Sequence, residues 1–284
     1  AVRVPTAAVG MNAPLDPAAP PELAWDGADT LWLQVAGTLC DLTCRHCFIT
    51  CGPNNDRHPF MAVAQVEAAL AWADAQGVND VYFTGGEPFI HPDIDTLVEL
   101  ALARGPLTVL TNGLHFTPER VSHLGRLFAA SRWSLDLRVS LDGPTAESND
   151  RLRGRGVFER VVEGLRRLVA AGVTPVLTVT LVDGSATERE AFASLLASAG
   201  VTRPRIKYLA PFRIGREARR GRAYGADERL ANVDVDEAGL EALQCRRSRM
   251  LTARGVWPCP ILVNDDTARM GDSLDDVVGA PLRL

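Results

Sequence analysis

Short runs of consecutive apolar residues alternate along the chain with longer stretches in which apolar residues recur every three or four positions. The short runs predict strands, and the longer stretches predict amphipathic helices. The expected strands lie at 31–39, 80–84, 107–111, 135–141, 174–181 and 204–210, and the expected helices at 61–76, 93–104, 118–130, 157–171 and 187–199. Strands and helices in regular alternation favour βα units around a parallel sheet.

Two segments fall outside this alternation. Residues 1–29 are rich in alanine and proline, and we expect them to form a flexible leader. Residues 211–284 begin with a stretch rich in glycine and arginine and end with a tail that carries two cysteines. The pattern therefore predicts a leader at 1–29, an α/β unit at 30–210 and a C-terminal extension at 211–284.

Composition narrows the function classes. The chain has 284 residues and a net charge of −5, which argues against an extended nucleic-acid surface. Its uninterrupted apolar stretches are all shorter than the roughly 18 residues of a membrane-spanning helix. Six cysteines, four of them between Cys40 and Cys51, do not resemble the disulfide framework of a small secreted domain. We therefore expect a cytoplasmic protein with no nucleic-acid or membrane partner.

Three cysteines at the end of the first apolar run are the strongest chemical signal. Cys40, Cys44 and Cys47 are separated by three and then two residues. Thiolates are the usual ligands of iron–sulfur clusters, and three of them leave one iron of a [4Fe–4S] cubane without a protein ligand. Zinc sites instead combine two closely spaced pairs of ligands. The spacing therefore favours an incompletely ligated cluster.

The segment Cys40-Asp41-Leu42-Thr43-Cys44-Arg45-His46-Cys47 resembles the cluster-binding motif of the radical S-adenosylmethionine (radical SAM) superfamily, with His46 where that motif has a ring. The resemblance implies a partial (β/α)6 TIM-like barrel with a short C-terminal extension. It also implies a [4Fe–4S] cluster, S-adenosylmethionine (SAM) and an external one-electron donor such as a flavodoxin or ferredoxin.

Polar residues at the ends of the expected strands match positions at which this superfamily binds SAM. The resemblance places the amino group of SAM at Gly85, Gly86, Glu87 and Pro88, where glycines allow close backbone approach and a carboxylate accepts hydrogen bonds from an ammonium. It assigns further SAM contacts to Asn112, Ser140, Asp142, Arg153, Thr178, Tyr208 and Leu209. Ordinary turns at Asn112 and Asp142, and an exposed basic loop at Arg153, are the alternative explanations.

The other three cysteines give a less specific indication of function. Cys51 is either an ordinary buried thiol or a nucleophile or hydrogen donor near the mouth of the cavity. Cys245 and Cys259 resemble the opening of a SPASM or twitch module, which holds auxiliary clusters, but no further cysteine follows Cys259. We expect either that the remaining ligands lie beyond Leu284, or that the module has lost its cluster, or that these are two structural thiols.

Other polar residues carry weaker expectations. His58 and His91 are expected at the surface. Five arginines either clamp an anionic substrate or form a solvated surface, and the second is the commoner outcome; they are Arg213, Arg216, Arg219, Arg220 and Arg222.

The function that this resemblance implies is reductive cleavage of SAM to a 5′-deoxyadenosyl radical, which abstracts a hydrogen atom from the substrate. We expect a small biosynthetic molecule that is oxidised or epimerised, because residues 1–29 are too short for the leader-binding domain of many peptide maturases. A peptide-modifying maturase is the first alternative. A non-catalytic iron–sulfur or zinc-binding module is the alternative of another class.

Overall fold

The computed structural model describes residues 22–180, 186–221, 223–225, 228 and 237–283. Its centre is a sheet in which six strands lie side by side in chain order, all parallel. They are β2 (Thr30–Leu33), β3 (Asp80–Phe83), β4 (Leu107–Thr111), β5 (Leu135–Ser140), β6 (Val176–Thr180) and β7 (Arg205–Leu209). This is the partial TIM-like α/β architecture that the sequence predicts.

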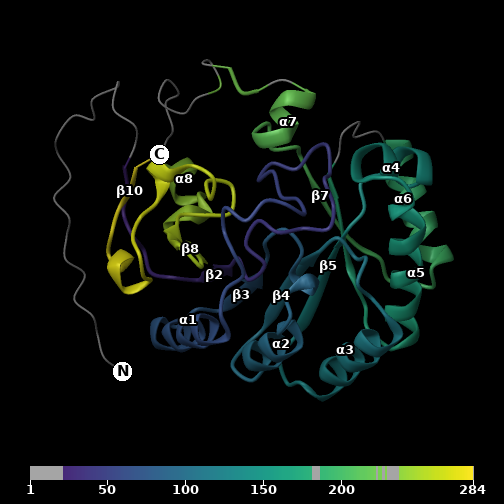
Figure 1. Ribbon diagram of the computed structural model, residues 1–284, viewed down its shortest axis with the longest axis horizontal. Helices are drawn as coiled ribbons and strands as arrows, with labels where there is room; N and C mark the ends of the chain where they lie inside the picture. Colours follow the sequence, from purple (N-terminus) through teal and green to yellow (C-terminus); the bar gives the residue numbers. More distant parts are fainter. Residues whose placement is uncertain (1–21, 181–185, 222, 226–227, 229–236, 284) are drawn as a thin grey trace.

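Helices connect these strands and cover one face of the sheet (Figure 1). They are α1 (Val63–Gln76), α2 (Ile94–Leu102), α3 (Pro118–Ala130), α5 (Val157–Ala170) and α6 (Ala186–Ser198). The short helix α4 (Ala146–Arg153) precedes α5 and lies at the end of the strands (Figure 1), where its Leu152 carbonyl accepts from the amide of Arg45. Alternate strand residues such as Leu33, Phe83 and Leu137 are buried with helix residues such as Leu97 and Leu165 in one apolar core. Because every crossover returns to a parallel strand, the loops that follow the strands gather at one end of the sheet.

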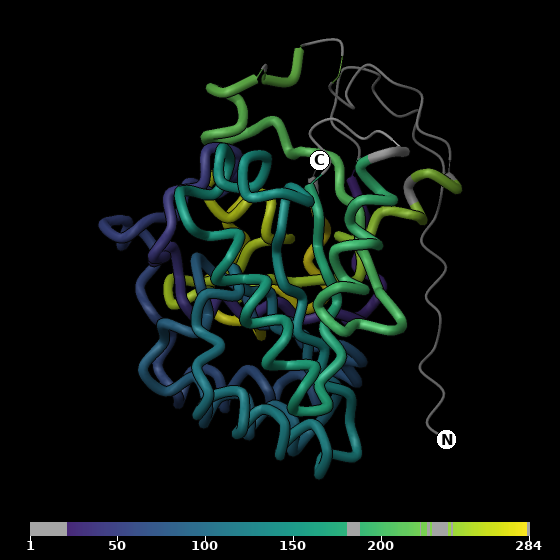
Figure 2. Tube along the Cα trace, turned by 90° about the vertical axis from the view of Figure 1, so that its right-hand side faces the viewer, coloured from purple at the N-terminus to yellow at the C-terminus, as the bar shows by residue number. Residues whose placement is uncertain are grey.

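The C-terminal extension adds to the same sheet. Strand β8 (Ser248–Thr252) pairs in parallel with β2, and β9 (Gly255–Trp257) pairs antiparallel with β8. Figures 1 and 2 show this yellow segment beside the purple β2, although the two are far apart in sequence. Helices α7 (Gly215–Arg220) and α8 (Glu237–Glu241) precede it. The extension therefore adds two strands to the sheet at its β2 edge.

The prediction of a flexible leader is wrong for its last residues, 22–29. Strand β1 (Glu22–Leu23) pairs antiparallel with β10 (Leu282–Arg283), and the amide of Asp29 donates to the carbonyl of Arg247 at 2.8 Å. These backbone bonds tie the segment to the C-terminal extension. Residues 1–21 lie outside the described residues.

Within the described residues, no helix combines the length and the apolar character that crossing a membrane requires.

Candidate functional site

The loop between β2 and α1 carries the three cysteines, and it is held by the glycine-rich end of β3. The amide of Gly86 donates to the carbonyl of Gly37 at 2.9 Å, and the amide of Glu87 donates to that of Leu39 at 3.0 Å. A Cβ on Gly86 would overlap the carbonyl oxygen of Leu39. Glycine is required here so that the β3 loop can pack directly on the chain that leads into Cys40.

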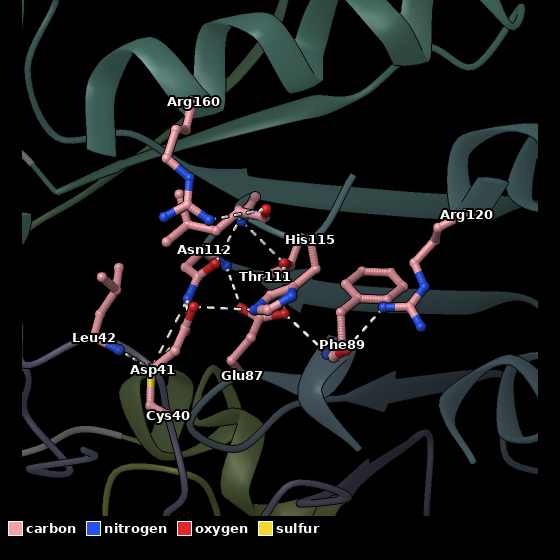
Figure 3. Close-up of polar contacts among 12 residues, drawn as sticks. Cys40, Asp41, Leu42, Glu87, Phe89, Thr111, Asn112, His115, Arg120 and Arg160 are labelled. Atoms are coloured by element: carbon pink, nitrogen blue, oxygen red, sulfur yellow. Dashed lines mark hydrogen bonds and ion pairs between the residues drawn. The ribbon is translucent and has the colours of Figure 1, made fainter. Parts of the chain in front are cut away.

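The Glu87 carboxylate links the ends of β3 and β4 (Figure 3). It is fully buried and accepts from Phe89 N at 3.0 Å, Thr111 Oγ1 at 2.7 Å and Asn112 N at 2.6 Å. Burial raises its pKa to about 7 despite these bonds. Because both carboxylate oxygens accept from the protein and the side chain is fully buried, Glu87 holds the ends of β3 and β4 together and does not reach a ligand ammonium; backbone carbonyls of this segment remain the predicted acceptors.

Asn112 continues this network to the cysteine loop. Its Nδ2 donates to Asp41 Oδ1 at 2.7 Å and lies 3.9 Å from Cys40 Sγ. Asp41 Oδ2 lies 3.0 Å from His115 Nε2. Burial acts to raise the pKa of Asp41, but the hydrogen bonds from His115 and Asn112 hold it below its usual range. The predicted site residue Asn112 therefore stands next to the first cysteine and orients the residue after it.

Asp142, at the end of β5, is the second anchor of the loop. Its Oδ2 lies 2.8 Å from His46 Nε2 and 2.6 Å from Arg153 Nε, and its Oδ1 accepts from Thr180 N at 2.7 Å. Burial acts to raise the pKa of Asp142, but Arg153 and His46 hold it well below the usual range. The structure thus joins Asp142 and Arg153, which the sequence predicts separately, to the ring before Cys47.

Helix α7 closes the loop from the other side through Arg216. Its Nε donates to the carbonyl of Cys44 at 2.8 Å, and its Nη1 and Nη2 donate to those of Thr50 at 3.2 Å and Cys51 at 2.5 Å. Thr50 has a φ of 57°, which is unusual for a β-branched residue. One guanidinium therefore fixes three carbonyls around the cysteines. The expectation of a solvated arginine is wrong for Arg216.

The rest of the arginine cluster is peripheral. Arg213 pairs with Glu228, and Arg220 pairs with Glu217 on its own helix. Arg219 is exposed, and Arg222 lies outside the described residues.

Replacing Arg216 by alanine is expected to loosen the loop. The carbonyls of Cys44, Thr50 and Cys51 lose a charged donor, which we estimate as a loss of about 2 kcal/mol of unfolding free energy. The same change should speed removal of iron by a chelator. Arg219→Ala, on the exposed side of the same helix, is the matched control and should match the wild type in both measurements. Equal chelation rates in the two variants would contradict this role of Arg216.

The three thiols are the predicted ligands of a cubane. Among the described residues, no three His, Cys, Asp or Glu side chains approach closely enough to enclose one metal ion. A cubane takes each thiolate on a different iron, so its ligands stand further apart than those of zinc. The hydrogen bond from the Cys51 thiol lowers the pKa of Cys47 to about 6, which favours the thiolate at this position, whereas burial raises the pKa of Cys40 and of Cys44.

Two further predicted residues line the inner face of the sheet. Ser140 and Thr178 are register partners on β5 and β6. The Thr178 hydroxyl is a buried polar atom without a hydrogen-bond partner among the described residues. Such an atom is costly unless a ligand or water satisfies it. The site therefore offers a polar group to a bound cofactor here.

Several expectations about side-chain placement need correction. Cys51 is 3% exposed, so it does not face the mouth of the cavity. Its Cys47 partner and burial raise the pKa of Cys51 well above the usual value, which agrees with an ordinary buried thiol. The Tyr208 ring packs on Phe192 and Arg189 of α6, away from the inner face. Only its backbone and Leu209 remain candidates for contact with adenine.

The two histidines expected at the surface are buried. His58 is 1% exposed, and its Nε2 lies 3.1 Å from the carbonyl of Val263. His91 is 3% exposed, and its Nε2 lies 2.8 Å from the carbonyl of Met61. Both rings therefore tie chain segments together.

Cys245 and Cys259 lie near each other in the C-terminal extension. Burial, followed by the neighbouring Cys259, raises the pKa of the Cys245 thiol. Both side chains are half-buried. No third described His, Cys, Asp or Glu completes a metal site with them, so an auxiliary cluster stays a prediction that requires ligands from elsewhere.

Comparisons with known proteins agree with this geometry. The chain is 33% identical over 165 residues to the mycofactocin maturase MftC of Mycobacterium tuberculosis, a match that covers 57% of this chain and 40% of that protein. It is 32% identical over 215 residues to GTP 3′,8-cyclase of Chlorobaculum tepidum, covering 71% of this chain and 61% of the cyclase. The chain thus spans less than two thirds of these relatives.

A similar solved structure is Streptococcus suis SuiB bound to the precursor peptide SuiA, with a TM-score of 0.69, 18% sequence identity, and coverage of 89% of this chain and 65% of SuiB. At that identity the likeness concerns the fold. The model of the radical SAM superfamily matches residues 35–196, which is more than half of the chain and includes the three cysteines and the end of β3. This chain therefore belongs to the radical SAM superfamily, whose members bind a [4Fe–4S] cluster and SAM.

Proposed function

We propose that the protein is a peptide-modifying radical SAM enzyme. The observation that carries the proposal is the three-cysteine loop, fixed at once by the ends of β3, β4 and β5 and by α7. Similarity to a protein named a maturase, and a fold shared with a protein solved with a precursor peptide, favour a peptide substrate. These similarities give less support to the small-molecule substrate that the sequence analysis expects first. It remains the second candidate because the chain is also similar to a GTP cyclase.

Cys40, Cys44 and Cys47 would hold the cluster in this proposal. SAM would lie over the strand ends, against the segment Gly85–Pro88, Asn112, Ser140, Thr178 and Leu209. When bound, the cluster and SAM together supply a one-electron cleavage and a hydrogen-abstracting group, with the electron delivered by an external donor protein.

The chain's own residues supply position and charge. Gly86 lets the β3 end approach the cluster loop, and the buried Glu87 carboxylate joins that end to β4, so that backbone carbonyls of the segment Gly85–Pro88 would accept from an ammonium. Arg153 forms an ion pair with Asp142 through Nε, and a guanidinium has further donors with which to bind a carboxylate. Each group is fixed in advance by the packing of strand ends, which is how a barrel aligns reacting atoms.

The test is direct. The anaerobically reconstituted protein, with reductant and SAM, is incubated with synthetic peptides encoded by short reading frames beside its gene. We expect one peptide to change in mass while an equal amount of 5′-deoxyadenosine forms. A rise in 5′-deoxyadenosine with small metabolites, and with none of the peptides, would contradict the peptide proposal and favour the second candidate.

A further inference from the structure

The face of the sheet opposite the helices is open. Along β5, Leu135, Leu137 and Val139 are buried against the helices, whereas Asp136 and Arg138 are half-exposed. Register partners share a face, so Leu110 on β4 and Thr178 on β6 lie on the same side and are half-exposed as well, whereas Thr108 on β4 is buried. Several side chains on the inner face of the barrel are thus only partly buried.

An aromatic pair covers the β2 side of this face. Trp32 and Tyr82 are register partners, and their rings stack with centroids 4.2 Å apart and an interplanar angle of 22°. Both are half-exposed. The Cζ of Arg138 lies 5.1 Å from the centre of the Tyr82 ring, and its Nη2 donates to Tyr82 Oη at 3.4 Å. The guanidinium is therefore held next to this aromatic pair.

Two cations on this face lack a carboxylate among the described residues. Asp136 is paired with Arg205 at 3.0 Å, and Asp80 lies at the opposite, amino end of β3. Arg138 and Lys207 form no ion pair with a described residue, and partial burial, followed by the nearby Arg138, lowers the pKa of Lys207. Two like charges that repel each other favour an anion placed between them.

The position of Lys207 relates this charge to the site. Thr178 is the register partner of both Ser140 and Lys207, so the three residues form one row across β5, β6 and β7. Ser140 and Thr178 are the predicted SAM contacts. Arg138 lies two residues before Ser140 on β5 and therefore on the same face. A ligand held by Arg138 and Lys207 therefore lies next to the space assigned to SAM.

We propose that Arg138 and Lys207 bind a carboxylate of the peptide substrate, while the Trp32–Tyr82 surface receives its neighbouring apolar side chain. This proposal rests on the proposed function and adds its specificity: the favoured peptide carries an acidic group beside an aromatic or aliphatic residue. Charge complementarity selects the occupant, because the two cations require an anion and the stacked rings require an apolar neighbour.

A matched pair of capped pentapeptides tests the proposal. One contains a single glutamate between tyrosine and leucine, and the other contains glutamine in its place, and both are titrated calorimetrically into the cluster-bound enzyme with SAM. We expect the glutamate peptide to bind about tenfold more tightly, which corresponds to about 1.4 kcal/mol. The Arg138→Gln/Lys207→Gln double variant should remove this difference. Arg166→Gln, on the exposed outer face of α5, should retain it.

Each remaining outcome overturns the proposal. Equal binding of the two peptides to the wild type, or no binding of either, shows that the cations do not select a carboxylate. Loss of SAM affinity in the double variant, with the peptide preference intact, assigns the cations to SAM. Free glutarate that binds as tightly as the glutamate peptide assigns them to a small acid. Peptide modification is measured separately, so a confirmed preference without any modified peptide would contradict the proposed function and not this binding site.

Discussion

Replacing Cys44 by alanine is expected to reduce 5′-deoxyadenosine formation to the level seen without enzyme. We assign three thiolates to the cluster, and loss of one would leave two iron atoms without a protein ligand. The surrounding hydrogen bonds come from Arg216 and Asn112, and these donors cannot replace a thiolate. The measurements are iron content after anaerobic reconstitution and 5′-deoxyadenosine in the presence of SAM and reductant.

Cys245→Ala is the matched control for this experiment. Cys245 lies beside Cys259 in the C-terminal extension and is not one of the three cysteines assigned to the cluster. The variant should therefore cleave SAM. Iron near four atoms per wild-type chain would account for a single cubane and would remove an auxiliary cluster from the description. SAM cleavage that persists in Cys44→Ala would contradict the assignment of the cluster ligands.

The sequence predicts the elements whose own residues carry a strong signal. Strand β4 and helix α3 agree with the expected limits at both ends. In α3, Thr117 caps the helix by accepting from Arg120 N, and Pro118 occupies its first position. Strand β2 is shorter than expected because its apolar run continues into a turn at Gly37, where backbone pairs with the cysteine loop replace the sheet.

Other elements are invisible to local patterns. Helix α4 buries only Asn149 and Leu152, so its apolar periodicity is too weak to recognise. Strand β8 contains the buried Arg249, whose guanidinium lies 4.0 Å from the centre of the Trp25 ring and donates to the carbonyls of Cys245, Ser248 and Ala280. A charged residue inside a short strand argues against a strand until its distant partners are known. The missed elements are therefore the ones that long-range contacts stabilise.

In the candidate site, too, the sequence identifies residues that belong to a local motif and misses residues whose partners are distant in the chain. Motif residues such as Cys40 and Glu87 are found from the sequence because their chemistry is local to the motif. Arg216 is missed because its role is to donate to carbonyls more than 160 residues away, and nothing in an arginine-rich segment distinguishes it from Arg219. The pairing of His46 with Asp142 is equally non-local. Sequence thus identifies ligands better than it identifies the groups that hold them.

Replacing Arg153 by methionine should have the second large effect, because it leaves Asp142 buried without its guanidinium partner. Removing one member of a buried ion pair costs about 3–5 kcal/mol, and the hydrogen bond with His46 offsets part of this, so we expect a loss of about 3 kcal/mol in unfolding free energy. Chemical denaturation near pH 7 measures it. SAM affinity should fall in parallel if Arg153 also binds the cofactor.

The double variant Arg153→Met/Asp142→Asn separates charge from packing. Because the new side chain at position 142 is neutral, the double variant should unfold at a higher denaturant concentration than Arg153→Met alone.

The pH dependence of the unfolding free energy gives an independent check. The folded-state pKa of Asp142 is depressed, so its stabilisation is present above the unfolded value of about 3.9 and is lost as the pH falls below it. The gap between wild type and Arg153→Met should therefore narrow below about pH 4. An equal gap at pH 7 and pH 3 would show that Arg153 stabilises the fold by packing, and that the link from Asp142 to the cysteine loop does not depend on charge.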